Sequence, residues 1–446
     1  MMEFVEIFAR AGGGGSGGSG GSGGGGLGLF AVPGIVSYFA TGAVKNKTQS
    51  KIAGAVAGLV MGLLVSIPYL VIGDIVWLVI AVISAGVGVV AGVFSDTLGA
   101  FRKNSKVAQH VVAQAGATDA VWNEQRIIEY ATQVFTRFQY DWGKMDLVSI
   151  QQYTTPEYAK HIGLMLYAMQ QMGRVNTMES IKIEEAVISY AHDDADNNGD
   201  RVSVAFSAQA HDVLQDTASG AQLTVNNDRF VEQWNFVRRE NMWLLYRIDQ
   251  ATEDSAMIVA SLRQFAQQHA MYYSPDWGNL LLPTRGQLFK HGFKNADINN
   301  HVIGFWTGDL LVQLYTYNSG RDNDMTHYIV GQINLSKSYG GILIRRRDSG
   351  FLGRFGLGIP KGYKDVSLEW GDFNQRYKVC ATDENQVTSF ELLNPSFMAW
   401  LYDQDLKVNI EVVDNVVYLY AKISAGEQRY AEMLTILQKS HKELKM

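Results

Sequence analysis

A short acidic run has the residue types of a calcium-binding loop. Residues 194–199 read Asp-Ala-Asp-Asn-Asn-Gly, which places oxygen-bearing side chains at alternate positions before a glycine, as such loops require. The twelfth position of the loop needs a bidentate glutamate, but this chain has Ala205 there. We therefore expect a polar hairpin turn here and no metal site.

Three histidines and one cysteine are the other candidates for reactive chemistry. His161, His192 and His211 could act as general acids or bases if an aspartate oriented one of them inside an apolar cavity. None has a recognisable partner in the sequence, so we expect them on solvated surfaces or on a helix face. The single cysteine, Cys380, lies in a strand-like run, which predicts an inert buried thiol and excludes an internal disulfide or a cysteine metal cluster. We expect no catalytic residue, no metal and no cofactor.

A glycine-rich basic segment could bind phosphate groups. Five glycines between residues 350 and 362 are interleaved with Arg345, Arg346, Arg347, Arg354 and Lys361. Their spacing fits neither a P-loop nor a dinucleotide-binding fingerprint. Two interpretations remain, a mobile basic loop and a contact with anionic lipid headgroups. The formal net charge of -6 argues against a general nucleic-acid-binding protein.

Two long apolar runs predict that the chain is anchored in a membrane. Residues 53–72 and 75–94 lack charge and are separated by Gly73 and Asp74, and each is long enough to cross the ~30 Å core of a bilayer. Basic residues flank the pair on both outer sides, which predicts a transmembrane hairpin with both outer ends in the cytoplasm. A buried hairpin of a soluble protein is the alternative. Residues 27–44 form either a third span or an interfacial segment, so we assign 27–96 as the transmembrane region.

The first 26 residues cannot build a core. Residues 1–10 carry an apolar helical stripe, and residues 12–26 contain only glycine and serine. We expect residues 1–26 to be a flexible segment, natural or introduced by engineering.

The middle of the chain, residues 115–254, has the pattern of an α+β domain. One helix is predicted to start at Thr118 and a second at Thr155, where Pro156 occupies the first turn. Four strand-like runs follow, at residues 180–190, 201–212, 229–237 and 242–250. A four-residue loop at 238–241 would pair Phe236 with Trp243, Trp234 with Leu245 and Glu232 with Arg247.

The aromatic face of that hairpin predicts an apolar pocket. The residues expected to line it are Trp234, Phe236, Trp243 and Leu245 from the strands, with Met165, Met169 and Met172 from the second helix. Ordinary core packing explains the same residues equally well.

The hairpin also resembles a known family. Residues 230–239 (Phe-Val-Glu-Gln-Trp-Asn-Phe-Val-Arg-Arg) and 243–250 (Trp-Leu-Leu-Tyr-Arg-Ile-Asp-Gln) are similar to the closing hairpin of the Tim forty-four-like (Tim44-like) family, and residues 135–158 resemble its helical half. The resemblance implies a cone-shaped fold of the nuclear-transport-factor-two type, with a curved antiparallel sheet and an apolar cavity. For the mitochondrial relative it implies peripheral membrane attachment and a tethering role in protein import.

The last part of the chain predicts a mainly-β domain. After a helical connector at 255–280, residues 281–446 show strand patterns at 302–306, 310–317, 327–335, 341–346, 366–369, 373–380, 407–412 and 416–421. A helix from Asn394-Pro395 and a terminal helix at 427–445 accompany them. Residues 373–384 and 392–401 resemble a bacterial domain of unknown function (number three-one-three-seven), which implies a fold but no activity.

Together these features predict a multi-pass protein of the bacterial inner membrane whose large C-terminal part faces the cytoplasm. We expect a non-enzymatic scaffold whose α+β domain holds an amphipathic polypeptide segment or a lipid acyl chain, linked to protein transport or membrane organisation. Its expected partners are membrane lipids and a polypeptide segment or membrane protein, and not nucleic acid. The alternative is an enzyme, which needs a carboxylate or histidine with a perturbed pKa inside the cavity.

Overall fold

The computed structural model describes residues 99–250, 256–274, 277–290, 292–294, 296–306, 310–320, 325–335, 337–347, 359–382, 393–405, 407–424 and 429–443. The predicted Gly/Ser segment and transmembrane region lie outside these residues. Within the described part of the chain, no helix combines the length and the hydropathy needed to cross a membrane.

The first domain is α+β. Its helices are α4 (Gly99–Ala115), α5 (Glu124–Gly143), α6 (Leu147–Ile150) and α7 (Pro156–Gln171), and its strands are β1 (Arg174–His192), β2 (Arg201–Asp216), β3 (Gln222–Asn226), β4 (Arg229–Arg239) and β5 (Met242–Gln250). The antiparallel sheet has the order β1-β2-β4-β5, and β3 also pairs with β2. The helices and the sheet enclose one aromatic-rich core.

Local sequence determines where the two long predicted helices begin. Thr155 caps α7 through its side-chain oxygen, which accepts from the Tyr158 backbone N–H, and Pro156 lies in the first turn, as predicted. The prediction of a helix start at Thr118 is wrong: Asn123 is the N-cap of α5, and its side chain accepts from the Arg126 N–H. Asparagine satisfies the same orphan backbone donor that threonine would.

The predicted register of the β4–β5 hairpin is wrong. The turn has two residues, Glu240 and Asn241, and Arg239 pairs with Met242. This turn places Phe236 opposite Leu245, and a bulge between Asn235 and Phe236 then shifts the rest of the ladder, so that Trp234 lies opposite Ile248. The physical reason is that Glu240 adopts a positive φ of 55°, which permits a tighter turn than the four-residue loop.

The second domain is mainly β. Its elements are α8 (Ala256–Gln268), β6 (Tyr272–Ser274), the 3₁₀ turns η2 (Trp277–Leu281) and η3 (Gly292–Lys294), β7 (Ala296–Trp306), β8 (Leu310–Ser319), β9 (Thr326–Asn334), β10 (Gly341–Arg346), β11 (Tyr363–Val366), α9 (Gly371–Arg376), β12 (Tyr377–Thr382), α11 (Pro395–Asp403), β13 (Asn409–Val413), β14 (Val416–Ile423) and α12 (Tyr430–Glu443). One nine-stranded antiparallel sheet has the order β11-β12-β10-β13-β14-β9-β8-β7-β6. The prediction of an antiparallel, mainly-β domain with a terminal helix is confirmed. The predicted strand at 373–380 is partly wrong, because its first half is the helix α9.

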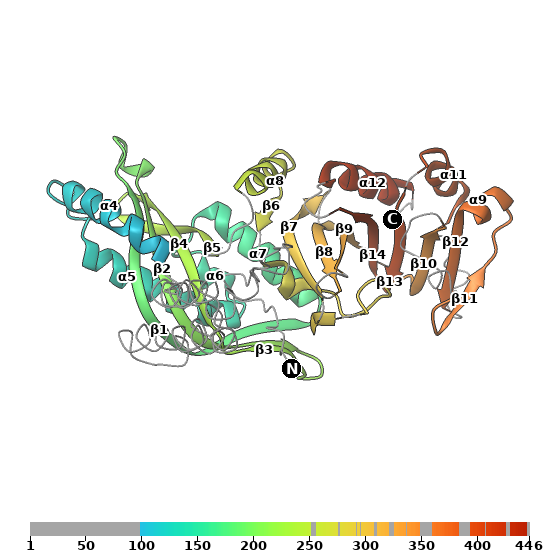
Figure 1. Ribbon diagram of the computed structural model, residues 1–446, viewed down its shortest axis with the longest axis horizontal. Coiled ribbons are helices and arrows are strands. Elements are labelled where there is room, and N and C mark those ends of the chain that lie inside the picture. The colour runs from blue at the N-terminus through green and yellow to red at the C-terminus, as the bar shows by residue number, and fades with distance from the viewer. Residues whose placement is uncertain are drawn as a thin grey trace, which may run out of the picture.

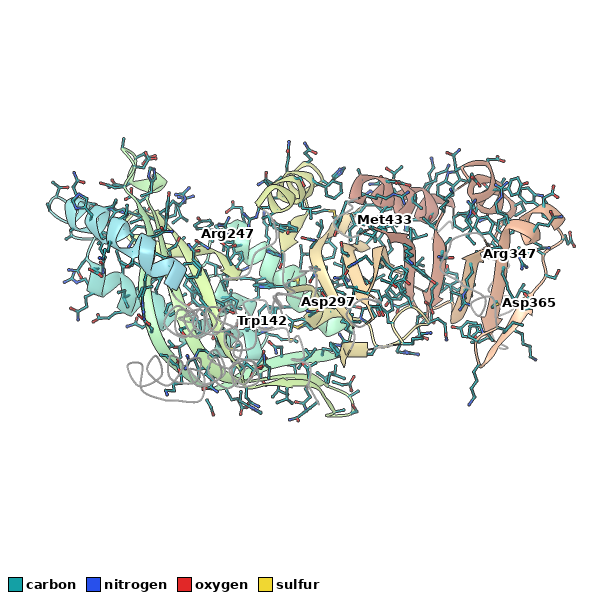
Figure 2. The ribbon with its side chains drawn as sticks, viewed as in Figure 1. Trp142, Arg247, Asp297, Arg347, Asp365 and Met433 are labelled. Carbon is teal, nitrogen blue, oxygen red and sulfur yellow. The ribbon has the colours of Figure 1, made fainter. Side chains whose placement is uncertain are left out.

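The two faces of this sheet are covered differently. Helices α8, α9, α11 and α12 line one face and supply an aliphatic core (Figure 1). The other face is rich in tyrosine: Tyr315, Tyr317, Tyr328, Tyr418 and Tyr420 pack with Phe289 and Leu288 from the segment before β7. Figure 2 shows Met433 of α12 beside the sheet, with Arg347 and Asp365 near its far end.

A buried carboxylate closes the tyrosine face. Glu411 on β13 is fully buried and accepts hydrogen bonds from the backbone N–H groups of Gln287 and Leu288. Burial raises the pKa of the Glu411 carboxyl, while these two donors and Arg345 oppose the rise. The loop is held close to the carboxylate because Gly286 adopts a φ of 112°, which a side chain would strain.

Candidate functional site

The seven residues predicted to line a cavity all lie in one core. Trp234 and Leu245 are fully buried, and the Trp234 ring contacts those of Phe135 (centroids 4.9 Å apart) and Phe138 (5.4 Å). The other members are Phe236, Trp243, Met165 and Met169, which are buried, and Met172, which is half-buried at the edge of the core. The structure therefore brings the predicted residues together, and their role as cavity lining stays a prediction.

A carboxylate, that of Glu232, lies inside this core, although the sequence predicted that it would pair with Arg247 on the sheet. Glu232 is fully buried, and its Oε2 accepts a hydrogen bond from Trp234 Nε1 at 3.0 Å. The register places Gln250 opposite Glu232, whereas Arg247 lies opposite Asn235 and contacts Asp249. Strand alternation could have revealed this position, because residues 232 and 234 must lie on the same face of β4.

Tyr158 on α7 interacts electrostatically with this carboxylate. Its side chain is buried, and burial together with the charges of Asp249 and Glu232 raises the pKa of the phenol well above its usual value. The phenol is thus fixed in its protonated form. Such a group can donate a hydrogen bond but cannot serve as a base near neutral pH.

A second buried polar network lies where the helices meet β1. Trp142 Nε1 donates to Asn176 Oδ1 at 3.1 Å, and Asn176 Nδ2 donates to Asp212 Oδ1 at 2.7 Å. All three side chains are buried. Figure 2 shows Trp142 in the interior of the α+β domain. These two buried hydrogen bonds can hold the indole ring of Trp142 in one orientation.

His161 lies on a face of helix α7, one of the two expected places, and that face is buried. Its ring lies between Tyr272 (centroids 5.4 Å apart, planes within 10°) and Trp277 (5.3 Å, 20°). Burial lowers its pKa to about 3, with a smaller contribution from the neighbouring His301. His301 is itself fully buried against Gln313, and burial lowers its pKa to about 4. Both rings are therefore neutral near pH 7.

The other reactive candidates have structural roles. His192 is exposed, and His211 Nδ1 lies 2.7 Å from Asn227 Oδ1. The acidic run forms a turn, as expected, with Asp194 and Asp196 accepting from nearby backbone N–H groups. Cys380 is buried, and burial raises the pKa of its thiol. Among the described residues, no cluster of three or more His, Cys, Asp or Glu side chains could hold a metal ion.

The basic residues predicted to touch lipid differ in their exposure. Arg345 and Arg346 are buried, and Arg346 donates to Asp405 Oδ1 at 2.8 Å, so neither guanidinium lies at the surface. Arg347 and Lys361 are exposed. Arg354 lies outside the described residues. Lipid contact by Arg347 and Lys361 stays a prediction.

The helix that follows the predicted membrane hairpin is packed on the α+β domain. Arg102 of α4 forms a two-point ion pair with Glu185 of β1, with Nε 3.0 Å from Oε1. Phe101 packs against Ala205 and Val231 on the sheet face opposite the aromatic core. The C-terminal half of α4 contributes Ala108, Val112 and Ala115 to the main core. Helix α4 thus spans from one side of the sheet to the other along β1.

These features define a two-part protein, an α+β domain with a buried aromatic and polar interior followed by a mainly-β antiparallel sheet domain. Residues 108–250 match the Tim44-like domain family, which confirms that part of the sequence prediction. The resemblance of the second domain to domain number three-one-three-seven stays a prediction. Among curated proteins, none matches the chain.

Three solved structures are similar in part. The crystal structure of the mycobacterial trehalose monomycolate transport factor A, TtfA, is 12% identical and covers 43% of this chain and 94% of its own, with a TM-score of 0.30. The intermembrane-space region of the chloroplast protein ARC6 is 10% identical over 28% of this chain and 97% of its own, with a TM-score of 0.22. An Ntf2-like protein involved in plasmid conjugation is 9% identical and covers 45% of this chain and 88% of its own, with a TM-score of 0.17.

Proposed function

We propose that this protein is a membrane-anchored, non-enzymatic binding scaffold that faces the cytoplasm. In this proposal the α+β domain holds an amphipathic polypeptide segment or a lipid acyl chain supplied at the membrane. The tethering role implied for the mitochondrial Tim44-like relative is the same kind of role.

The observation that carries the proposal is the packing of α4. The predicted membrane hairpin ends near residue 94, and α4 starts at Gly99. Because Phe101 and Arg102 already contact the sheet, few residues are left between the predicted bilayer edge and the folded domain. A domain held this way meets partners that are themselves in or on the membrane.

The interior of the domain supports binding more than catalysis. Its aromatic and methionine side chains offer adaptable apolar contacts, with a few fixed polar groups among them. The nearest match to the enzyme alternative is Glu232 with Tyr158, which places a carboxylate and a neutral phenol in the same core. Both are buried among packed side chains, so a substrate would have to displace core residues to reach them.

Ligand titration of the full chain in lipid nanodiscs tests the proposal. The probes are a labelled amphipathic helical peptide and a fluorescent fatty acid, and we expect at least one to bind with a Kd on the order of micromolar. Met172→Asp, at the half-buried edge of the core, should weaken that binding about tenfold. Val148→Asp is the matched control, since Val148 is 73% exposed on α6. Absence of binding by both probes would refute the function.

A further inference from the structure

A short segment of the second domain is buried in the core of the first. Residues 277–281 form the 3₁₀ turn η2 between β6 and β7. Trp277, Leu280 and Leu281 are 2%, 0% and 2% exposed, and all three belong to the aromatic core of the α+β domain. Their apolar side chains thus pack in the core of the Tim44-like domain, which Ile303 and Leu311 of the second sheet also join.

Trp277 lies in a slot made of three aromatic side chains. Its ring centroid is 5.3 Å from Trp142, in an edge-to-face arrangement, and 5.3 Å from His161, with nearly parallel planes. Tyr158 is the third member, at 6.1 Å. We call Trp142, Tyr158 and His161 the aromatic slot. Indole rings inserted in such slots dominate the energy of many polypeptide interfaces.

The main chain of the segment is held by a buried cation. Arg174 Nη1 donates to the carbonyl oxygen of Leu280 at 3.1 Å, and the Arg174 side chain is 3% exposed. Burial lowers the pKa of its guanidinium to about 10. Burying a guanidinium between two domains costs desolvation free energy. Its N–H groups can, however, donate to the backbone carbonyl groups of any polypeptide segment that lies against it.

We propose that the aromatic slot and Arg174 form the polypeptide-binding site of the α+β domain, and that the chain's own segment 277–281 occupies this site in cis. The ligand class is a polypeptide segment with an aromatic residue followed three and four positions later by leucine, as in Trp277, Leu280 and Leu281. This inference rests on the proposed binding function and specifies its ligand and its regulation. A partner segment binds when the cis segment leaves.

The cis segment is also attached to its own domain. Asn279 Oδ1 accepts from the Ile298 N–H at 2.7 Å, and the Trp277 N–H donates to Ser274 Oγ at 3.1 Å. Because it is tethered on both sides, the segment competes for the site at a high effective concentration. The apparent affinity for a partner segment is the intrinsic affinity multiplied by the fraction of time that the site is free. Removing its anchor ring should therefore strengthen binding in trans.

The first experiment measures binding of a synthetic peptide. A fluorescent peptide with the sequence of residues 272–284 is titrated against the full chain in nanodiscs. Trp277→Ala should bind the peptide at least tenfold more tightly than the parent does. Trp400→Ala, which removes a half-buried ring from α11 in the second domain, is the matched control and should bind as the parent does. A peptide with alanine in place of its tryptophan should bind to none of them.

The second experiment uses the unchanged chain, so it does not depend on how a variant folds. Hydrogen exchange should show the amides of residues 277–281 opening at least tenfold more often than those of β2, and excess peptide should accelerate their exchange further. Equal protection of the two regions would overturn the proposal, as would a folded Trp277→Ala variant that binds peptide no better than the parent. If only this inference is wrong, the helical peptide or the fatty acid still binds to the chain. If the proposed function is wrong, neither probe binds to any variant.

Discussion

Replacing His161 by phenylalanine should make the protein less sensitive to acid. The His161 pKa is about 3 in the folded chain, against about 6.5 in an unfolded chain. Since the folded pKa is lowered, the unfolded chain binds the extra proton between these values, and stability falls as the pH drops below about 6.5. At ~1.4 kcal/mol per pKa unit, the loss is about 2 kcal/mol at pH 5 and approaches about 5 kcal/mol near pH 3.

Thermal unfolding of the detergent-solubilised chain at pH 7 and pH 5 checks this value. A loss of about 2 kcal/mol corresponds to a fall in Tm of roughly 4 to 8 °C for a unit of 150 to 250 residues. His161→Phe keeps the stacked ring and also removes Nε2, which has no hydrogen-bond partner among the described residues. The variant should be at least as stable as the parent at pH 7 and lose less between pH 7 and pH 5. His192→Gln, which alters an exposed histidine, is the control. An unchanged pH dependence in His161→Phe would refute the assignment of a buried neutral ring.

Three further predictions concern other parts of the chain. Gly331→Ala should lower Tm by several degrees in a melt, because the added Cβ would lie 2.6 Å from Leu437 Cδ1 and force α12 away from the sheet. Glu411→Ala should destabilise the second domain by about 1 to 3 kcal/mol in denaturant unfolding, since it leaves the Leu288 N–H buried without its acceptor. Ala218→Cys, at an exposed turn, should react with an impermeant maleimide after lysis but not in intact cells; labelling of intact cells would contradict the cytoplasmic placement.

Features set by neighbouring residues were predictable from the sequence. The start of α7 at Thr155 and of α11 at Asn394 follows from a capping side chain and a proline in the first turn, both of which act within three residues. The two-residue turn formed by Asp414 and Asn415 between β13 and β14 is also set locally, because aspartate tolerates the positive φ of 55° found at Asp414.

Features set by distant residues were not predictable. Burial of His161 depends on Tyr272 and Trp277, which lie on the far side of the domain boundary in sequence. Residues 373–376 were predicted as the first half of a strand, whereas they belong to α9, which uses Phe373 to fill the core beside Tyr377. In both cases tertiary packing decided between local patterns of similar strength.

The order of strands in the second sheet has a consequence for synthesis of the chain. The sheet of the α+β domain is complete once residue 250 has been made. Strand β9, by contrast, has its second neighbour only when β14 arrives, with His327 paired to Ile423. Until then β9 presents an open edge, and α12, which covers the same region through Gly331, is later still. The second sheet therefore forms slowly and only after β14 has been made, and a chain shortened before β14 would expose that edge to aggregation.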